Sequence, residues 1–361
     1  MAANTGGIDP HQDTFTVGVV DEHGVEIAVV SFGNSGAGYS DAIELLSRHG
    51  VTTVGVEGSG LWGRHVAIAL VTAGFDVREV PAQRTAARRR ARSQPKTDRI
   101  DAVATARALL AEPTLGPAQL FELDDPVVAE IEAVLDHRRT LLAVRMQFLA
   151  AVGDQLAKLP TEIRDQLGTS GKVEERLRRL ATIDHMPVSA AAAYRLAWLL
   201  EHIEVDRRQR QQLRALGRTL DALLDRHGTT LRDEPGIGTV GAATLLVEVG
   251  NPTRFATEAK FARWCGTGAV ALSSGEGSGQ PVSHRVDWKG NRRINSILYV
   301  ASVTQQRDLP EARAFLNRKI SEGKTRRVAR RAHKRHLANR VIRRMWKDHQ
   351  RLHHQVAAAT G

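Results

Sequence analysis

Cysteine and long apolar runs are almost absent from this sequence. The single cysteine, Cys265, excludes an internal disulfide and a zinc site built from several thiolates, which fits a reducing compartment. No run approaches the roughly 18 apolar residues that a membrane-spanning helix needs. The N-terminus also lacks the basic start and apolar core of a signal peptide. We therefore expect a soluble, cytoplasmic protein with no membrane partner.

Aromatic residues and zinc-protease signatures are also scarce. Phe, Trp and Tyr make up 4% of the chain, which argues against a single-strand binder that relies on base stacking. The 14 histidines include no HExxH motif, so a zinc protease is excluded. What the chain has in excess is positive charge: 51 Lys and Arg against 40 Asp and Glu, a formal net charge of +11. This excess favours an anionic partner such as nucleic acid over a merely basic enzyme.

Alternating apolar residues predict two strands near the N-terminus. In TFTVGVV (14–20) and VEIAVV (25–30) apolar side chains recur at every second position, and the intervening DEHG favours a turn. The two strands should form an antiparallel hairpin. Because strand-like and helical segments then alternate, the pattern predicts an α/β domain with a mixed sheet over residues 1–120.

The rest of the chain is predicted to be mainly helical, in two further domains. Within residues 121–228, apolar side chains recur at nearly helical spacing in two long segments with charged flanks. They predict a helical or coiled-coil arm, used for self-association or as an intramolecular subdomain. Residues 229–361 form the third predicted domain, which combines a glycine-rich turn, a Gly/Ser-rich loop and a basic C-terminal helix.

Four acidic residues stand where a metal site would need them. Asp9 ends the first apolar stretch, Glu57 ends a later strand, and Asp98 and Asp101 are three apart at the start of an alanine-rich helix. Residues three apart share one helical face. Two Mg²⁺ ions that clamp a phosphodiester need such a cluster of carboxylates. Spacing alone leaves ordinary alternatives open: helix capping, turn formation, a solvated strand end and pairing with arginine.

Three segments around these acidic residues resemble a known family: GGIDPHQDTFTVGVVDEHG (6–24), VGVEGSGLWGRHVAIALVTAGFDVREVPAQR (54–84) and KTDRIDA (96–102). They are similar to the RuvC-like (RNase H-like) domain of the DEDD transposases of insertion-sequence family one hundred and ten, relatives of the Piv DNA invertase. The resemblance implies an N-terminal RuvC-like catalytic domain. It assigns catalysis and the binding of Mg²⁺ or Mn²⁺ to Asp9, Glu57, Asp98 and Asp101.

The stretch PGIGTVGAATLL (235–246) fits a helix-hairpin-helix element. Gly236 and Gly238 remove the Cβ atoms that would keep a phosphate away from the backbone amides. A glycine-rich turn between two helices is a common feature, so the pattern by itself is a weak sign of nucleic-acid binding. In a strongly basic chain with a predicted phosphodiester site it becomes more informative.

The segment FARWCGTGAVALSSGEGSGQPVSHRVDWKGNRRINSILY (261–299) resembles the transposase domain of the same family. The resemblance implies that Ser274 is a nucleophile that forms a covalent link to DNA, with Ser273 as the neighbouring alternative. Serine needs activation to act as a nucleophile, which a divalent metal could supply. By composition alone, this Gly/Ser-rich stretch reads as a flexible linker.

Basic residues flank both predicted catalytic segments. They are interpreted as contacts to the nucleic-acid backbone, with solvated charge as the alternative. In the C-terminal helix the apolar residues Leu337, Val341 and Met345 are spaced four apart, which predicts a packed stripe opposite a cationic face. The full set of predicted nucleic-acid contacts is Arg88, Arg89, Arg90, Gly236, Gly238, Arg285, Lys289, Arg292 and Arg293.

Taken with the resemblance, these features predict a transposase or recombinase that cleaves and exchanges DNA strands through a serine–DNA intermediate. The resemblance further implies double-stranded DNA partners (element ends and target), a structured guide RNA encoded by the element, association with the nucleoid, and dimers or tetramers. Three alternatives stay open: a site-specific invertase with the same chemistry, a junction nuclease that uses water, and a non-catalytic nucleic-acid scaffold.

Overall fold

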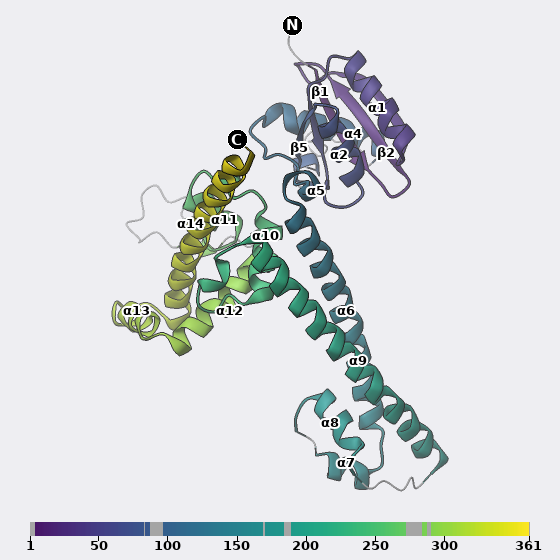
Figure 1. Ribbon diagram of the computed structural model, residues 1–361, viewed down its shortest axis with the longest axis vertical. Helices are drawn as coiled ribbons and strands as arrows, with labels where there is room; N and C mark the ends of the chain where they lie inside the picture. Colours follow the sequence, from purple (N-terminus) through teal and green to yellow (C-terminus); the bar gives the residue numbers. More distant parts are fainter. Residues whose placement is uncertain are drawn as a thin grey trace, which may run out of the picture. The chain divides into compact units, whose positions relative to one another are not determined.

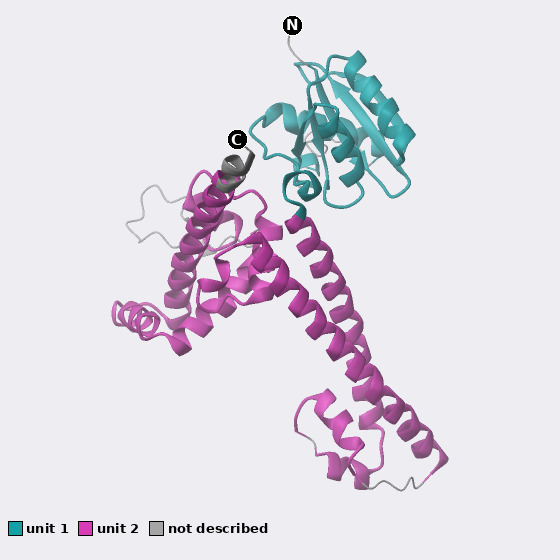
Figure 2. Ribbon diagram, viewed as in Figure 1, with its two compact units in different colours: residues 1–126 teal, residues 127–361 magenta. Residues whose placement is uncertain are grey.

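The chain divides into two compact units, residues 1–126 and 127–361 (Figure 2). The computed structural model describes residues 4–82, 84–86, 97–168, 170–183, 189–271, 284–286 and 290–360. Among these residues, no helix combines the length and the apolar character needed to cross a membrane. The three domains expected from the sequence stay a prediction, and the two units are described separately below.

Unit 1 is built on a five-stranded mixed sheet (Figure 1). Its strands, in the order β3–β2–β1–β4–β5, are β1 (Thr5–Pro10), β2 (Thr14–Val20), β3 (Glu26–Gly33), β4 (Thr53–Val56) and β5 (Asp76–Glu79). β1, β2 and β3 are antiparallel neighbours, whereas β4 and β5 run parallel to β1. The β2–β3 pair is the predicted hairpin, and the predicted mixed sheet is confirmed.

The helices of unit 1 include α1 (Gly36–Arg48), α2 (Arg64–Thr72), α4 (Asp98–Ala111) and the short α5 (Phe121–Asp124). Apolar side chains of α1 and α2 pack with those of the sheet into one core cluster, in which Ile8, Phe15, Val17, Leu46 and Leu70 are fully buried. α4 packs on the sheet as well, with contacts to β1, β2 and β4.

A row of glycines lets α4 approach the sheet very closely. Gly7 of β1 is paired in register with Gly18 of β2 on one side and Gly55 of β4 on the other. A Cβ atom on Gly7 would lie 2.2 Å from the backbone nitrogen of Ala106 and 2.4 Å from the carbonyl oxygen of Ala102, both in α4. The backbone of α4 thus packs directly on the backbone of β1. This contact fixes the position of the start of α4 relative to the end of β1.

Unit 2 begins with an antiparallel pair of long helices, α6 (Pro126–Ala157) and α9 (Ala190–His227) (Figure 1). Arg145 of α6 and Asp206 of α9 are joined at 2.7 Å, and both side chains are buried. α7 (Thr161–Leu167) and α8 (Val173–Leu180) lie between them in the sequence and share a leucine-rich core cluster with both long helices. This segment is the helical arm predicted from periodicity.

The remainder of unit 2 is mainly helical, as predicted. Its helices and 3₁₀ turns are η1 (Leu231–Asp233), α10 (Thr239–Val249), η2 (Pro252–Arg254), α11 (Glu258–Trp264), α12 (Arg292–Asp308), α13 (Pro310–Ser321) and α14 (Arg326–Thr360). Two short antiparallel strands, β6 (Ala269–Ala271) and β7 (His284–Val286), pair with each other. The stripe predicted in the C-terminal helix is buried in α14, at Leu337, Val341 and Met345. The predicted α/β plus α fold class, with its mixed sheet, is therefore confirmed.

Candidate metal centre

Two of the predicted acidic residues lie at the carboxyl ends of neighbouring parallel strands. Asp9 belongs to β1, and Glu57 directly follows β4. The residues just before them, Ile8 and Val56, are partners in the parallel ladder, and the backbone amide of Glu57 donates to the carbonyl of Ile8 at 3.3 Å. Carboxyl edges of parallel strands commonly form ligand sites in α/β proteins. The sheet therefore presents both carboxylates at one edge.

The start of α4 supplies the other two acidic residues. Thr97 caps the helix, since its hydroxyl accepts from the amide of Ile100 at 3.3 Å. The cap is thus provided without Asp98, whose side chain is 59% exposed. Asp101, one turn further, is buried. A helix N-terminus also stabilises nearby negative charge through its unpaired amides and its dipole.

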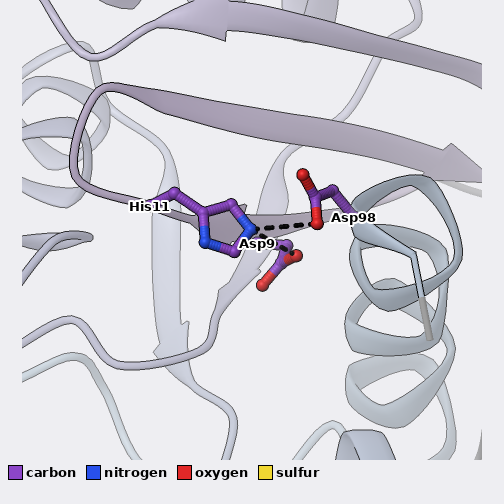
Figure 3. A group of neighbouring side chains, drawn as sticks. All are labelled: Asp9, His11 and Asp98. Carbon is purple, nitrogen blue, oxygen red and sulfur yellow. Dashed lines mark ion pairs between the residues drawn. The ribbon is translucent and has the colours of Figure 1, made fainter.

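His11 joins two of these carboxylates (Figure 3). Its Nε2 atom lies 3.3 Å from Oδ2 of Asp9 and 3.2 Å from Oδ1 of Asp98. The nitrogen is buried, yet neither contact has hydrogen-bond geometry. Asp9, His11 and Asp98 each offer one ligand atom, and these atoms lie within 4.8 Å of one another. Sequence reasoning did not single out His11, although it stands two residues after Asp9.

The pKa of Asp9 reports how the acidic groups crowd together. It is raised from 3.8 to about 6, with burial of the carboxyl group as the largest cause. The charge of His11 acts in the opposite direction. Three further carboxylates add to the rise through their negative charge: Asp101, Glu57 and Asp98. The other three acidic residues predicted from the sequence therefore lie within electrostatic range of Asp9.

Glu79 holds the turn that carries Glu57. It ends β5, and its carboxylate accepts from the backbone amides of Gly58 and Ser59, at 3.2 Å each, and from the Ser59 hydroxyl. Burial is the largest cause of its raised pKa, and the charge of Glu57 contributes in the same direction. We found no signal for this role in the sequence, because it depends on the register between β4 and β5.

The predicted glycine turn has a packing role in the structure. Gly236 has φ +84°, and a Cβ there would lie 2.8 Å from the Cα atom of Ala301 in α12. Close packing and positive φ thus both require glycine at this position. Gly238 is the N-cap of α10, and a Cβ there would meet nothing within 4 Å. This leaves the amino end of α10 sterically open at that glycine, as the predicted phosphate contact needs.

The remaining predicted contacts differ in their surroundings. Arg293 pairs with Glu248 at 2.6 Å, and Asn291, the N-cap of α12, donates to the same carboxylate at 2.7 Å. Arg292 lines a basic pocket that is described below. Arg285 belongs to β7, and its side chain is not among the described features. Also outside the described residues are Arg88, Arg89, Arg90, Ser273, Ser274 and Lys289.

Comparisons with known proteins agree with the resemblance noted above. The model of the DEDD transposases of the IS110 type matches residues 6–159, and that of the transposase IS116/IS110/IS902 family matches residues 228–317. A curated relative, the insertion element IS110 uncharacterized 43.6 kDa protein of Streptomyces coelicolor, is 32% identical over 117 residues. That match covers 32% of this chain and 28% of the relative.

Among solved structures, T. thermophilus RuvC in complex with a Holliday junction substrate is 17% identical, with a TM-score of 0.26. The match covers 32% of this chain and 99% of that one. The two family models together match more than half of the 361 residues and fall in both units. The chain therefore belongs to the IS110 family of transposases.

Proposed function

We propose that this protein is a transposase that cleaves and rejoins DNA strands at a divalent-metal centre in unit 1. Asp9, Glu57, Asp98 and Asp101 hold the metal, and Ser274 is the nucleophile. Membership of the family supports the reaction class. The supporting observation in the structure is the buried carboxyl group of Asp9, whose pKa is raised to about 6 mainly by burial and further by the negative charges of Asp101, Glu57 and Asp98.

The residues present fit a hard divalent cation. Carboxylate oxygens suit Mg²⁺ and Mn²⁺, and imidazole is a further ligand available to Mn²⁺. The buried Nε2 atom of His11, which makes no hydrogen bond, faces two of the carboxylates. Bound cations would stabilise the negative charge that develops on the phosphoryl group during strand cleavage. The chain's own part is to hold the carboxylates together at the strand ends and the start of α4.

The proposed covalent step exchanges one phosphodiester bond for another. The hydroxyl oxygen of Ser274 forms a bond to the scissile phosphorus, and the bond from phosphorus to one deoxyribose oxygen breaks. The serine proton ends on that released oxygen, which becomes a free hydroxyl. A later attack by the hydroxyl of another strand reverses these changes and restores Ser274. This balance requires no external oxidant or energy source, which suits the rejoining of DNA strands.

A trapping experiment tests the proposal. The purified protein is incubated with Mg²⁺ and DNA that carries the ends of its own element, and adducts are denatured and mapped by mass spectrometry. We expect DNA on Ser274 in the wild type, none in Ser274→Ala, and an unchanged yield in the control Ser273→Ala. Asp101→Asn should abolish the adduct while DNA binding persists.

Two outcomes would contradict the proposal. Strand cleavage that survives in Ser274→Ala without an adduct would indicate a nuclease that uses water. Activity in cells that survives in Asp9→Ala and Asp101→Ala would indicate a scaffold without catalysis. A fixed target that needs no RNA would instead identify a site-specific invertase with the same chemistry.

We further propose that the protein acts as a dimer or tetramer on double-stranded DNA, with a structured RNA from its element as guide. The basic excess of the chain supports a polyanionic partner. Sequencing of RNA that copurifies with the protein, with the mass of the complex measured by light scattering, tests both points. Recovery of bulk cellular RNA alone, on a monomeric protein, would contradict them.

A further inference from the structure

A pocket of about 920 Å³ lies between α12 and the first turns of α14 in unit 2. This volume is near the upper end of the range for ligand pockets, about 300–1,000 Å³. Six of its lining side chains are basic, and none of its described lining residues is acidic. The basic residues are Arg292, Arg326, Arg327, Arg330, Arg331 and Lys334.

The spacing of the basic residues in α14 places them on one side of the helix. Arg326, Arg330 and Lys334 are successively four apart, as are Arg327 and Arg331, so they form two adjacent rows. Like charges at this spacing repel one another, and the repulsion destabilises the helix. An anion bound in the pocket would relieve it.

Arginines further along the same helix form ion pairs with carboxylates. Arg340 pairs with Glu234 at 2.8 Å, Arg343 with Glu258, and Arg344 with Asp233 at 3.4 Å. By contrast, no carboxylate of the described residues lies within ion-pair distance of any of the six pocket cations. These three arginines of α14 are therefore paired within the protein, whereas the pocket cations have no carboxylate partner among the described residues.

Lys334 is held in place at the pocket wall. Its Nζ atom donates to Oδ1 of Asn295 at 2.8 Å, and Asn295 donates in turn to the carbonyls of Cys265 and Gly266, at 2.9 Å each. Burial lowers the pKa of Lys334 and is the largest cause of that shift. A half-buried ammonium group with only a neutral partner is favourably placed for an incoming anion.

The pocket also has an aromatic wall. Tyr299 lines it with 46% of its surface exposed. The guanidinium of Arg330 lies 5.7 Å from the centre of the tyrosine ring, and its Nη1 atom is 3.4 Å from the phenol oxygen. Cationic grooves with exposed aromatic side chains are typical of proteins that bind single strands, because phosphates and unstacked bases are recognised together. The low aromatic content of the chain argued against a single-strand binder that relies on base stacking. A single exposed ring, however, is sufficient to stack on a single base.

We propose that this pocket binds an unpaired segment of a nucleic-acid strand, with its phosphates on the cations of α12 and α14 and a base beside Tyr299. The inference rests on the proposed function only for the nature of the polyanion, and it requires neither metal nor Ser274. A stiff duplex, with its bases stacked inside, would offer no unpaired base to Tyr299.

A binding experiment in EDTA separates this proposal from catalysis. Fluorescence anisotropy follows a labelled 12-nucleotide DNA strand over a range of salt concentrations. Each phosphate contact to a single strand contributes about 0.7 to the slope of log K against log salt. In R327Q/R331Q we expect the slope to fall by about 1.4 and the affinity at low salt to fall at least tenfold.

The matched control is R343Q/R344Q, which removes two positive charges from the same helix. Because those arginines are already paired with carboxylates, its slope should stay close to that of the wild type. Equal losses in the two double variants, with unchanged thermal unfolding, would overturn the proposal. So would an unchanged slope in R327Q/R331Q.

Tyr299 provides the test for an unpaired base. Tyr299→Ala should weaken single-strand binding at least fivefold, since stacking of one base contributes about 1–3 kcal/mol, whereas Tyr299→Phe should bind like the wild type. Neither variant should change the affinity for a duplex of the same sequence. Repeating the series with RNA identifies the source of the strand: losses with DNA, RNA or both support the pocket. Losses with neither, or equal losses with the duplex, overturn it.

Discussion

Asp9 is an acidic side chain of unit 1 whose surroundings disfavour its negative charge. Its side chain is 13% exposed and lies in the field of three other carboxylates, whereas a positive charge on His11 would act against them. In the absence of metal, the folded protein holds a proton on Asp9 more tightly than the unfolded chain does. Stability and metal binding are therefore linked through this residue.

The first prediction concerns pH. Because the pKa of Asp9 is about 6 in the folded protein, mainly through burial, and 3.8 in an exposed carboxyl group, the folded state binds more protons between these values. In EDTA, this residue's contribution to stability is present below pH 4 and lost as the pH rises through 6. The loss amounts to at most about 3 kcal/mol. Urea unfolding from pH 4 to 8, with Asp9→Asn as reference, measures it; a pH-independent difference between the two proteins would refute the assignment.

The second prediction is that Asp9→Asn stabilises the metal-free protein at pH 7.5. The amide removes a buried charge from a cluster of like charges, so the free energy of unfolding in EDTA should rise by about 1–3 kcal/mol. With Mg²⁺ at a concentration that saturates the wild type, the order should reverse, since the wild type binds the cation more tightly and gains more stability from it. Thermal unfolding with EDTA or Mg²⁺ measures both effects. Lower stability of the variant in EDTA would contradict this prediction.

At the level of single elements, the glycine row positions α4, which carries Asp98 and Asp101. A methyl group on Gly7 would meet the backbone of α4 at 2.2 Å and 2.4 Å, which no side-chain movement can relieve. α4 would have to shift away from β1, and Asp98 and Asp101 would move with it. The close approach of helix and sheet is thus part of the site.

We therefore predict that Gly7→Ala destabilises the protein by about 3 kcal/mol or more and abolishes Mn²⁺ binding. Gly18→Ala, with backbone contacts of 2.9–3.1 Å, should keep the fold and weaken Mn²⁺ binding in part. Gly36→Ala, which meets nothing within 4 Å, serves as control. Urea unfolding and calorimetry measure both properties. Mn²⁺ affinity in Gly18→Ala equal to that of the control would show that α4 tolerates displacement.

The long helices of the arm carry a buried polar cluster. Asp206 is fully buried and accepts hydrogen bonds from Arg145 at 2.7 Å and from Arg210 at 2.8 Å. Arg145 also donates to Gln209 at 3.1 Å.

We predict that Asp206→Ala, which leaves Arg145 without its carboxylate, lowers the free energy of unfolding by about 3–5 kcal/mol, whereas R145M/D206A should lower it much less. Hydrogen exchange of α6 and α9 measures local stability. Equal costs in the two variants would show that the ion pair does not hold the helices in register.

At the scale of the whole molecule, the sequence predicts what depends on local pattern and misses what depends on register. The hairpin and the helical arm can be predicted from the spacing of apolar residues along the chain. The four acidic residues can be picked out because they stand at predicted strand ends and at the start of a predicted helix. The glycine row becomes visible only when Gly7, Gly18 and Gly55 are aligned across three strands. Likewise, the basic pocket requires α12 and α14 to lie together, although their pocket residues are about thirty positions apart.

The two proposed sites lie in different units of the chain. The acidic centre belongs to unit 1, whereas the basic pocket belongs to unit 2. Variants of one site should therefore leave the binding property of the other intact. Asp101→Asn, for example, should keep the single-strand affinity and salt dependence of the wild type in EDTA.

The most direct test is a calorimetric titration of Mn²⁺ into the metal-free protein and its amide variants at pH 7.5. We predict that Asp9→Asn, Glu57→Gln, Asp98→Asn and Asp101→Asn each lower the affinity at least tenfold. The control Glu122→Gln, whose carboxylate pairs with Arg64 in the same unit, should bind like the wild type. If the four variants and the control bind Mn²⁺ equally well, these carboxylates do not form one metal centre.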